Sequence, residues 1–120
     1  MIKIMNDLPG NVLGVSAEGT ITGKDYETVL IPAVEKIVKT NKKVRLLYHL
    51  GSGFIEFELS AMLDDAKVGL KYFSAWEKIA LVSDHELINS FMKFFGHMMH
   101  GDVRIFKDAE LAEAKSWIIE

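Results

Sequence analysis

The chain has 120 residues, of which 49% are hydrophobic and 26% charged, and this composition predicts one domain (residues 1–120) with a real core. The net charge of −3 argues against nucleic acid as a partner, because phosphate binding usually requires a basic excess. Cysteine is absent, which excludes disulfides and thiolate chemistry and favours a reducing compartment such as the cytoplasm.

Two short segments of alternating apolar and polar residues open the chain, at residues 2–6 and 12–18. The alternation predicts two half-buried strands, and the turn residues between them indicate an antiparallel hairpin. Thr22 and Asp25 then fit a capping box, which predicts a helix reaching to about residue 41. Pro32 lies on the polar side of this helix and should bend its axis.

The remaining elements alternate between strands and helices. We expect a strand at 44–50, a helix at 59–73, a strand at 78–83, a helix at 87–99, an edge strand at 103–106 and a last helix capped by Asp108. The strands at 44–50 and 78–83 are almost continuously apolar, which is typical of parallel strands buried on both faces. The order ββαβαβαβα therefore predicts an α/β domain with a five-stranded mixed sheet and four helices.

The helix expected at 87–99 has an unusually broad apolar face, with an arc of about 160° at 100° per residue. The arc consists of Leu87, Ile88, Phe91, Met92, Phe94, Phe95, Met98 and Met99. A helix that packs only on a sheet needs a stripe closer to 100° wide. The surplus must contact a neighbouring helix, a second subunit, an apolar ligand or a membrane.

Residues 51–58 separate a strand from the next helix and are expected to form a long loop. Gly51, Ser52 and Gly53 lack the further glycines and the lysine of a phosphate-binding loop. A loop of this length exceeds the usual two to six residues, and such loops are often functional. Phe54 and Phe57 are expected to close over a site at the carboxyl ends of the strands, where α/β sheets bind ligands.

The polar residues give little support for catalysis or metal binding. His97, His100 and Asp102 have a spacing that could place three ligands near one metal, but no further residue supports such a site. Asp64 and Asp65 are assigned to the first turn of their helix, where carboxylates stabilise the helix dipole. No serine has the spacing of a hydrolase nucleophile. We therefore expect no enzyme activity, no metal and no cofactor.

Three segments, at residues 76–84, 101–106 and 114–118, resemble the SpoIIAA-like proteins of bacteria, which are small relatives of the STAS fold. The resemblance extends upstream through residues 25–26, 30–32 and 65–69 and so covers nearly the whole chain. It implies parallel strands wound as a β-α superhelix, with helices on the faces of the sheet. The fold group is also similar to the CRAL-TRIO lipid-carrying domains, whose apolar pockets are gated by a moving helix.

The leading hypothesis is a non-enzymatic binding module with a pocket for a small apolar or lipid-like ligand. The residues expected to line or gate the pocket are Phe54, Phe57, Met62, Leu63, Phe91, Phe95 and Met98. Phe94, Met99 and Lys93 are expected to contact a membrane or a partner, which includes a homodimer mate. Residues 1–7 contain no apolar core of the length typical of a signal peptide, and no apolar run approaches about 20 residues, so we expect a cytoplasmic protein, peripheral at most on the inner membrane face.

The alternative is a protein-interaction module of the anti-sigma-factor-antagonist kind. STAS domains of that kind are switched by phosphorylation of a serine at the start of the helix after the third strand. The resemblance implies Ser52 and Ser60 as the positional candidates. The usual Asp-Ser-Ser/Thr-Gly motif is absent from residues 50–60, which favours the ligand-binding hypothesis.

Overall fold

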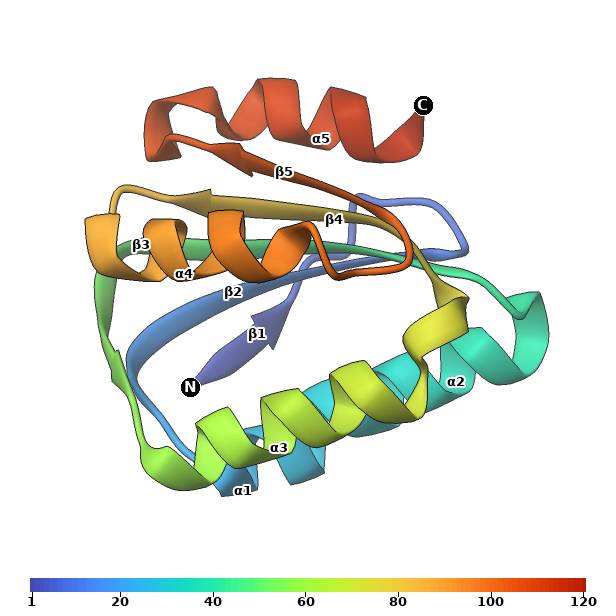
Figure 1. Cartoon of the computed structure of the whole chain (residues 1–120), viewed down its shortest axis with the longest axis horizontal. Coiled ribbons are helices and arrows are strands. Elements are labelled where there is room, and N and C mark those ends of the chain that lie inside the picture. The colour runs from blue at the N-terminus through green and yellow to red at the C-terminus, as the bar shows by residue number, and fades with distance from the viewer.

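A five-stranded mixed sheet organises the chain, and the computed structural model describes all residues from 1 to 120 (Figure 1). The strands are β1 (Ile2–Ile4), β2 (Val12–Ile21), β3 (Val44–Phe57), β4 (Trp76–Ser83) and β5 (Asp102–Phe106), and they lie in this order across the sheet. β1 is antiparallel to β2, and the other neighbouring strands are parallel. The hairpin, the parallel strands and the edge position of β5 agree with the expectations from sequence.

Helices cover both faces of this sheet. They are α1 (Gly23–Asp25), the π-helical turn η1 (Tyr26–Leu30), α2 (Ile31–Asn41), α3 (Leu59–Lys71), the 3-10 turn η2 (Phe73–Ala75), α4 (Glu86–Gly96), the 3-10 turn η3 (Asp108–Glu110) and α5 (Leu111–Ile119). Because α1, η1 and α2 follow one another without a break, the four helices and the order ββαβαβαβα are confirmed. The first three of the four helices pack toward one face, and α5 packs on the other (Figure 1).

The first helix begins with the expected capping box. The Thr22 hydroxyl accepts a hydrogen bond from the Asp25 backbone N–H at 3.2 Å, and the Asp25 carboxylate accepts one from the Thr22 N–H at 2.9 Å. A π turn, η1, interrupts this helix and ends two residues before Pro32, the residue at which a bend of the axis is expected. In this turn the N–H of Ile31 donates to the carbonyl of Tyr26, five residues earlier. Proline has no N–H to donate, which disfavours a regular α-helical ladder at this point.

The prediction of a loop at residues 51–58 is wrong, because β3 continues through Gly51 and Gly53 as far as Phe57. β2 is also longer than expected and supplies a partner strand, with Gly19 opposite Phe54 and Ile21 opposite Phe57. The register shifts on both sides of Gly19, whose φ of +66° suits glycine. The two strands thus extend as a ribbon beyond the end of β4, and a sequence window around residues 51–53 contains no sign of this partner.

Three helix boundaries also differ from expectation. α3 ends at Lys71, and α4 ends at Gly96 rather than at residue 99. Asp108 lies within η3 instead of capping α5, and its N–H donates to the Asp84 carboxylate at 3.1 Å. Helix ends depend on local capping contacts, so they are less constrained by periodicity than helix interiors are.

The face of the sheet under α5 forms a closed core. Ala114 and Ile118 of α5 are fully buried against Leu47, Ala80 and Val82 of the central strands. Two cations also hold the C-terminal end of α5, where the helix dipole is negative. The guanidinium of Arg45 on β3 donates to the Ile118 carbonyl at 2.9 Å, and the ammonium of Lys78 on β4 donates to the Trp117 carbonyl at 3.0 Å.

Candidate ligand-binding cleft

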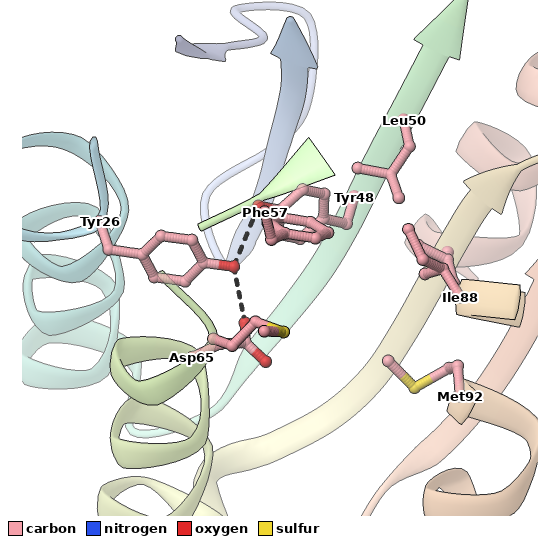
Figure 2. A pocket seen from close by; sticks show the side chains of 9 residues that line it. Tyr26, Tyr48, Leu50, Phe57, Asp65, Ile88 and Met92 are labelled. Carbon is pink, nitrogen blue, oxygen red and sulfur yellow. Dashed lines mark hydrogen bonds between the residues drawn. The ribbon is translucent and has the colours of Figure 1, made fainter. Parts of the chain in front are cut away.

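A cleft of about 160 Å³ opens between α3 and α4 on the other face of the sheet (Figure 2). Its lining comprises Tyr26 of η1; Tyr48, Leu50 and Phe57 of β3; Met62 and Asp65 of α3; Leu81 of β4; and Ile88 and Met92 of α4. Eight of these nine residues are hydrophobic, and Asp65 is the exception. The long β3 matters here, because its extension carries Phe57 over the end of the cleft.

One end of the cleft contains a short chain of hydrogen bonds (Figure 2). The Tyr26 hydroxyl donates to Oδ1 of Asp65 at 2.8 Å and lies 3.0 Å from the Tyr48 hydroxyl. An ionised carboxylate only accepts, so the Tyr26 proton goes to Asp65 and the Tyr48 proton goes to Tyr26. Burial raises the pKa of both phenols well above the usual range, and the Asp65 carboxylate adds to this effect. Both tyrosines therefore stay protonated.

Asp65 lies on the inner stripe of α3, four residues after Ala61 and three before Val68, both of which are buried. The residue is exposed as a whole, and its carboxyl end is part-buried where it accepts the hydrogen bond from Tyr26. Burial raises the pKa of this carboxyl, and the hydrogen bond from Tyr26 opposes the rise. The expectation that Asp65 lies in the first turn of its helix is wrong. α3 begins at Leu59, so Asp65 lies in the second turn.

The broad apolar arc of α4 is divided between two environments. Ile88, Met92 and the following Met99 are partly buried and pack against the core. The outer stripe, by which we mean Leu87, Phe91, Phe94, Phe95 and Met98, is exposed, with exposed fractions from 44% to 75%. On this outer stripe the Phe91 and Phe95 rings are stacked at 5.5 Å, and the Phe94 ring meets Phe95 edge-on at 5.1 Å. No residue of α4 is fully buried.

The residues expected to line a pocket are found in three places. Phe57 and Met62 line the cleft. Phe54 is buried in the core, with its ring 4.8 Å from Phe57, and Leu63 is exposed on α3 outside the lining. The other three, Phe91, Phe95 and Met98, belong to the outer stripe of α4.

Of the residues expected to meet a membrane or partner, Phe94 and Lys93 are exposed, whereas Met99 is partly buried against the core. Ser52 is exposed on the extended part of β3. Ser60 lies in the first turn of α3, where its hydroxyl accepts a hydrogen bond from the Gly23 N–H at 3.0 Å. This contact joins the starts of α1 and α3.

Sequence reasoning missed the polar end of the cleft and much of its floor. The missed residues are Tyr26, Tyr48, Leu50, Asp65, Leu81, Ile88 and Met92. One signal was available: Asp65 interrupts the stripe of Ala61 and Val68 at helical spacing, so an acid is directed toward the protein interior. The partner Tyr26 lies 39 residues away, and no local pattern links the two.

A second polar group lies near the carboxyl ends of β4 and β5, beside the middle of β3. Nε2 of His49 is 3.5 Å from Oδ1 of Asp108, and Asp84 accepts the Asp108 N–H. Burial and the neighbouring Asp84 raise the pKa of Asp108, while His49 and His85 oppose the rise. The structure contains no group of three histidine, aspartate or glutamate side chains arranged to hold a metal ion.

The mixed sheet with helices on both faces defines an α/β domain of the SpoIIAA type, and comparison with known proteins agrees. The sequence pattern of the SpoIIAA-like family matches residues 12–119, so the chain belongs to the SpoIIAA-like family. The resemblance inferred from sequence is thereby confirmed. No curated protein matches the chain.

The fold is similar to a solved structure, that of an uncharacterised protein with a SpoIIAA-like fold from Shewanella loihica PV-4. The match has a TM-score of 0.77 and 24% sequence identity, and it covers 98% of this chain and 92% of that one. This likeness concerns the fold. No helix of the structure combines the length and the apolar content that crossing a membrane requires.

Proposed function

We propose that the chain is a non-enzymatic binding module that holds a small apolar or lipid-like ligand between α3 and α4. The observation that carries this proposal is the apolar cleft, in which eight of nine lining residues are hydrophobic. A volume of about 160 Å³ is enough for a group the size of a benzene ring. The rest of a longer ligand would extend from the open side of the cleft along the neighbouring apolar side chains.

The loose packing of α4 supports a role as a gate, meaning a helix that moves to admit the ligand. Its cleft-facing residues Ile88 and Met92 are only partly buried, and the helix has no fully buried residue. Elements with few buried apolar contacts open at a low free-energy cost. A shift of α4 would widen the cleft without disturbing the residues packed beneath α5.

The same helix is proposed to contact the surface of a membrane, at the inner face if the chain resides in the cytoplasm. The outer stripe of α4 exposes three phenylalanines, and contiguous apolar surface of this kind marks sites of interaction. Lys93 on α4 and Lys67 and Lys71 on α3 are exposed and carry charges that attract anionic lipid head groups.

Ligand binding is tested by filling the cleft. Met62→Trp is expected to reduce the affinity for the apolar dye N-phenyl-1-naphthylamine at least tenfold, because the indole would occupy the cleft. Leu70→Trp is the matched control: it makes the same change on the same helix, at a side chain that is 75% exposed and outside the lining. Mass spectrometry of organic extracts from the purified protein would identify a native ligand. Equal dye binding by both variants and the wild type would refute the proposal.

Membrane contact is tested by sedimentation with vesicles of phosphatidylcholine and phosphatidylglycerol. Phe94→Glu is expected to abolish co-sedimentation, whereas Ile119→Glu should leave it unchanged. The control residue is 52% exposed on α5, on the other face of the sheet, and receives the same charge. If the wild type does not co-sediment with vesicles and Phe94→Glu converts a dimer to a monomer, the outer stripe is an interface between two copies of the chain.

A second candidate function, regulation by serine phosphorylation, is favoured by one observation. Ser60 lies in the first turn of the helix that follows the third strand, which is the position used by phosphorylated STAS domains. A phosphate there would disrupt the hydrogen bond from Gly23 to the Ser60 hydroxyl and disturb the junction of α1 and α3. Phosphopeptide mass spectrometry of the native protein tests it, with Ser52 as the other candidate; absence of phosphate from both would remove this candidate.

A further inference from the structure

We infer that the ligand carries a protonated amine, or a weaker neutral hydrogen-bond donor such as a hydroxyl, that binds Oδ2 of Asp65 while its apolar body fills the cleft. This inference rests on the proposed ligand-binding function and specifies the chemistry of the ligand's head group. It is carried by the polar end of the cleft and by the pattern of donors and acceptors found there.

The cleft offers hydrogen-bond acceptors and has no spare donor. Tyr48 donates to Tyr26, and Tyr26 donates to Oδ1 of Asp65, so both phenol protons are already used. The other lining side chains are apolar. A carboxylate or phosphate head group would therefore meet a negative charge and find no hydrogen-bond donor.

Asp65 has an oxygen that is free to accept a further hydrogen bond. Its Oδ2 accepts no hydrogen bond from the chain, and no lysine, arginine or histidine forms an ion pair with the carboxylate. A carboxylate in apolar surroundings is costly unless it is paired. A ligand ammonium would supply the missing partner and a charge-assisted hydrogen bond, which is about twice as strong as a neutral one. A hydroxyl would supply only the weaker bond.

The orientation of the Asp65 carboxylate is set by two tyrosines. Tyr26 holds Oδ1 from the η1 side, and Tyr48 supports Tyr26 from the floor of the sheet (Figure 2). The two phenols thereby fix the carboxylate at the end of the cleft. A fixed acceptor loses little freedom on binding, which favours recognition of a single donor group.

The protonation state of Asp65 determines whether the cleft prefers an amine or a carboxylate ligand. The titratable groups that face Asp65 are Tyr26 of η1 and Tyr48 of β3, with Asp25 close enough to influence Tyr48. α4 contributes only Ile88 and Met92 to the lining, and neither titrates. A neutral Asp65 would donate a proton and would prefer a carboxylate ligand, whereas an ionised Asp65 prefers an amine.

The test compares three probes with the same alkyl chain, dodecylamine, dodecanol and dodecanoate; the two ionic probes are used below their micelle concentrations, and dodecanol is used below its solubility limit. Displacement of N-phenyl-1-naphthylamine gives the three affinities. We expect dodecylamine to bind at least tenfold more tightly than dodecanoate at pH 7.5, with dodecanol between them. The preference for the amine should grow as pH rises through the titration of Asp65.

Asp65→Asn should bring the affinities of dodecylamine and dodecanoate to within threefold of each other, because the amide removes the charge. Glu86→Gln is the matched control: it removes the same charge from exposed α4 surface outside the cleft and should leave the tenfold preference intact. Circular dichroism confirms that each variant folds. Tyr26→Phe is a second variant, which frees Oδ1 and should alter the preference without removing the charge.

Tighter binding of dodecanoate than dodecylamine, or an unchanged preference in Asp65→Asn, would overturn the inference and leave the ligand-binding function standing. Failure of all three probes to displace the dye, or of the dye to bind, would count against the proposed function itself. Loss of the amine preference in Glu86→Gln would show that the net negative charge of the protein, and not Asp65, attracts the amine.

Discussion

The two faces of the sheet are built differently, although each is covered by amphipathic helices. Under α5 the contact is closed: Ala114 and Ile118 have no exposed surface. On the other face, α4 has no fully buried residue and presents an exposed apolar stripe. The difference shows that an apolar helix face does not by itself determine whether a helix seals the core.

The positions of the contacts explain the difference. α5 is held along its length by buried side chains and at its C-terminal end by Arg45 and Lys78. α4 has only partly buried contacts with the core, through Ile88 and Met92; in addition, Asn89 donates to the Ser83 carbonyl at 2.7 Å, and Gly96 lies close to Val103 of β5. The middle of α4 is left to face the cleft.

The largest expected effect is on the closed face. Ile118→Ala should lower the free energy of unfolding by about 3 kcal/mol, because it leaves a cavity in a packed core. Urea denaturation measures the change. The matched control is Ile119→Ala, at a neighbouring side chain that is 52% exposed, which should cost less than about 0.5 kcal/mol. Equal losses in the two variants would mean that α5 is not sealed as described.

A smaller effect is expected at the C-terminal end of α5. Lys78→Met should cost about 1.5 kcal/mol, because it removes a charged hydrogen bond to the Trp117 carbonyl and a cation stacked 4.7 Å from the Trp117 ring. Thermal and urea unfolding give the value. Lys67→Met, on the exposed surface of α3, should change stability little. An unchanged stability of Lys78→Met would show that the Lys78 contact does not help to hold α5 on the sheet.

On the open face, removing a charge should stabilise the protein. Folding raises the pKa of Asp65, so its ionised form is disfavoured in the native state. The Asp65 contribution to stability is thus fully present below the unfolded value of about 3.9 and is lost as pH rises through the folded pKa. Asp65→Asn should therefore gain about 1 kcal/mol at pH 7, an amount discounted for the solvent that reaches the residue.

Urea denaturation from pH 4 to pH 8 checks this sign. The advantage of Asp65→Asn over the wild type should be smallest at pH 4 and should grow with pH. An advantage that shrinks as pH rises would mean that the carboxylate is stabilised in the native state, in contradiction to its position in the apolar cleft.

The smallest effect is expected on the outer stripe of α4. Phe94→Ser should change the free energy of unfolding by less than about 0.5 kcal/mol, since the side chain is already 67% exposed. Phe106, which is 3% exposed beneath α5, provides the contrast, and its replacement by serine should destabilise the protein severely. Denaturation of both variants at low protein concentration makes the comparison; a large loss in Phe94→Ser would mean that α4 is packed more tightly than described.

The fold was largely predictable from sequence because its signals are local. Alternation at residues 12–18, the capping box at Thr22 and the apolar strand at 78–83 each specify an element without reference to distant residues. The extension of β3 was not predictable in this way. Gly51 and Gly53 favour a turn locally, and only pairing with the extended β2 keeps them in a strand.

The cleft depends still more on distant residues. The breadth of the apolar arc on α4 correctly indicated surplus apolar surface, but periodicity does not reveal which side of an arc faces the sheet. Ile88 and Met92 pack against the core and Phe91 and Phe95 are exposed, a rotation of α4 that becomes defined only once the helix packs beside β4 and β5. The pairing of Tyr26 with Asp65 likewise requires α1 and α3 to meet, as they do where Gly23 contacts Ser60.

The π turn η1 has a consequence for how chain length can vary near the cleft. A π turn accommodates one residue more than an α-helical turn does, and either turn completes about one revolution. Deleting one residue between positions 27 and 30 would therefore restore a regular helix and leave Tyr26 on nearly its present face, directed toward Asp65. The same deletion within the regular part of α2 would instead rotate Tyr26 by about 100° relative to the residues after the deletion. The polar end of the cleft thus tolerates a change of chain length at η1 that it would not tolerate a few residues later.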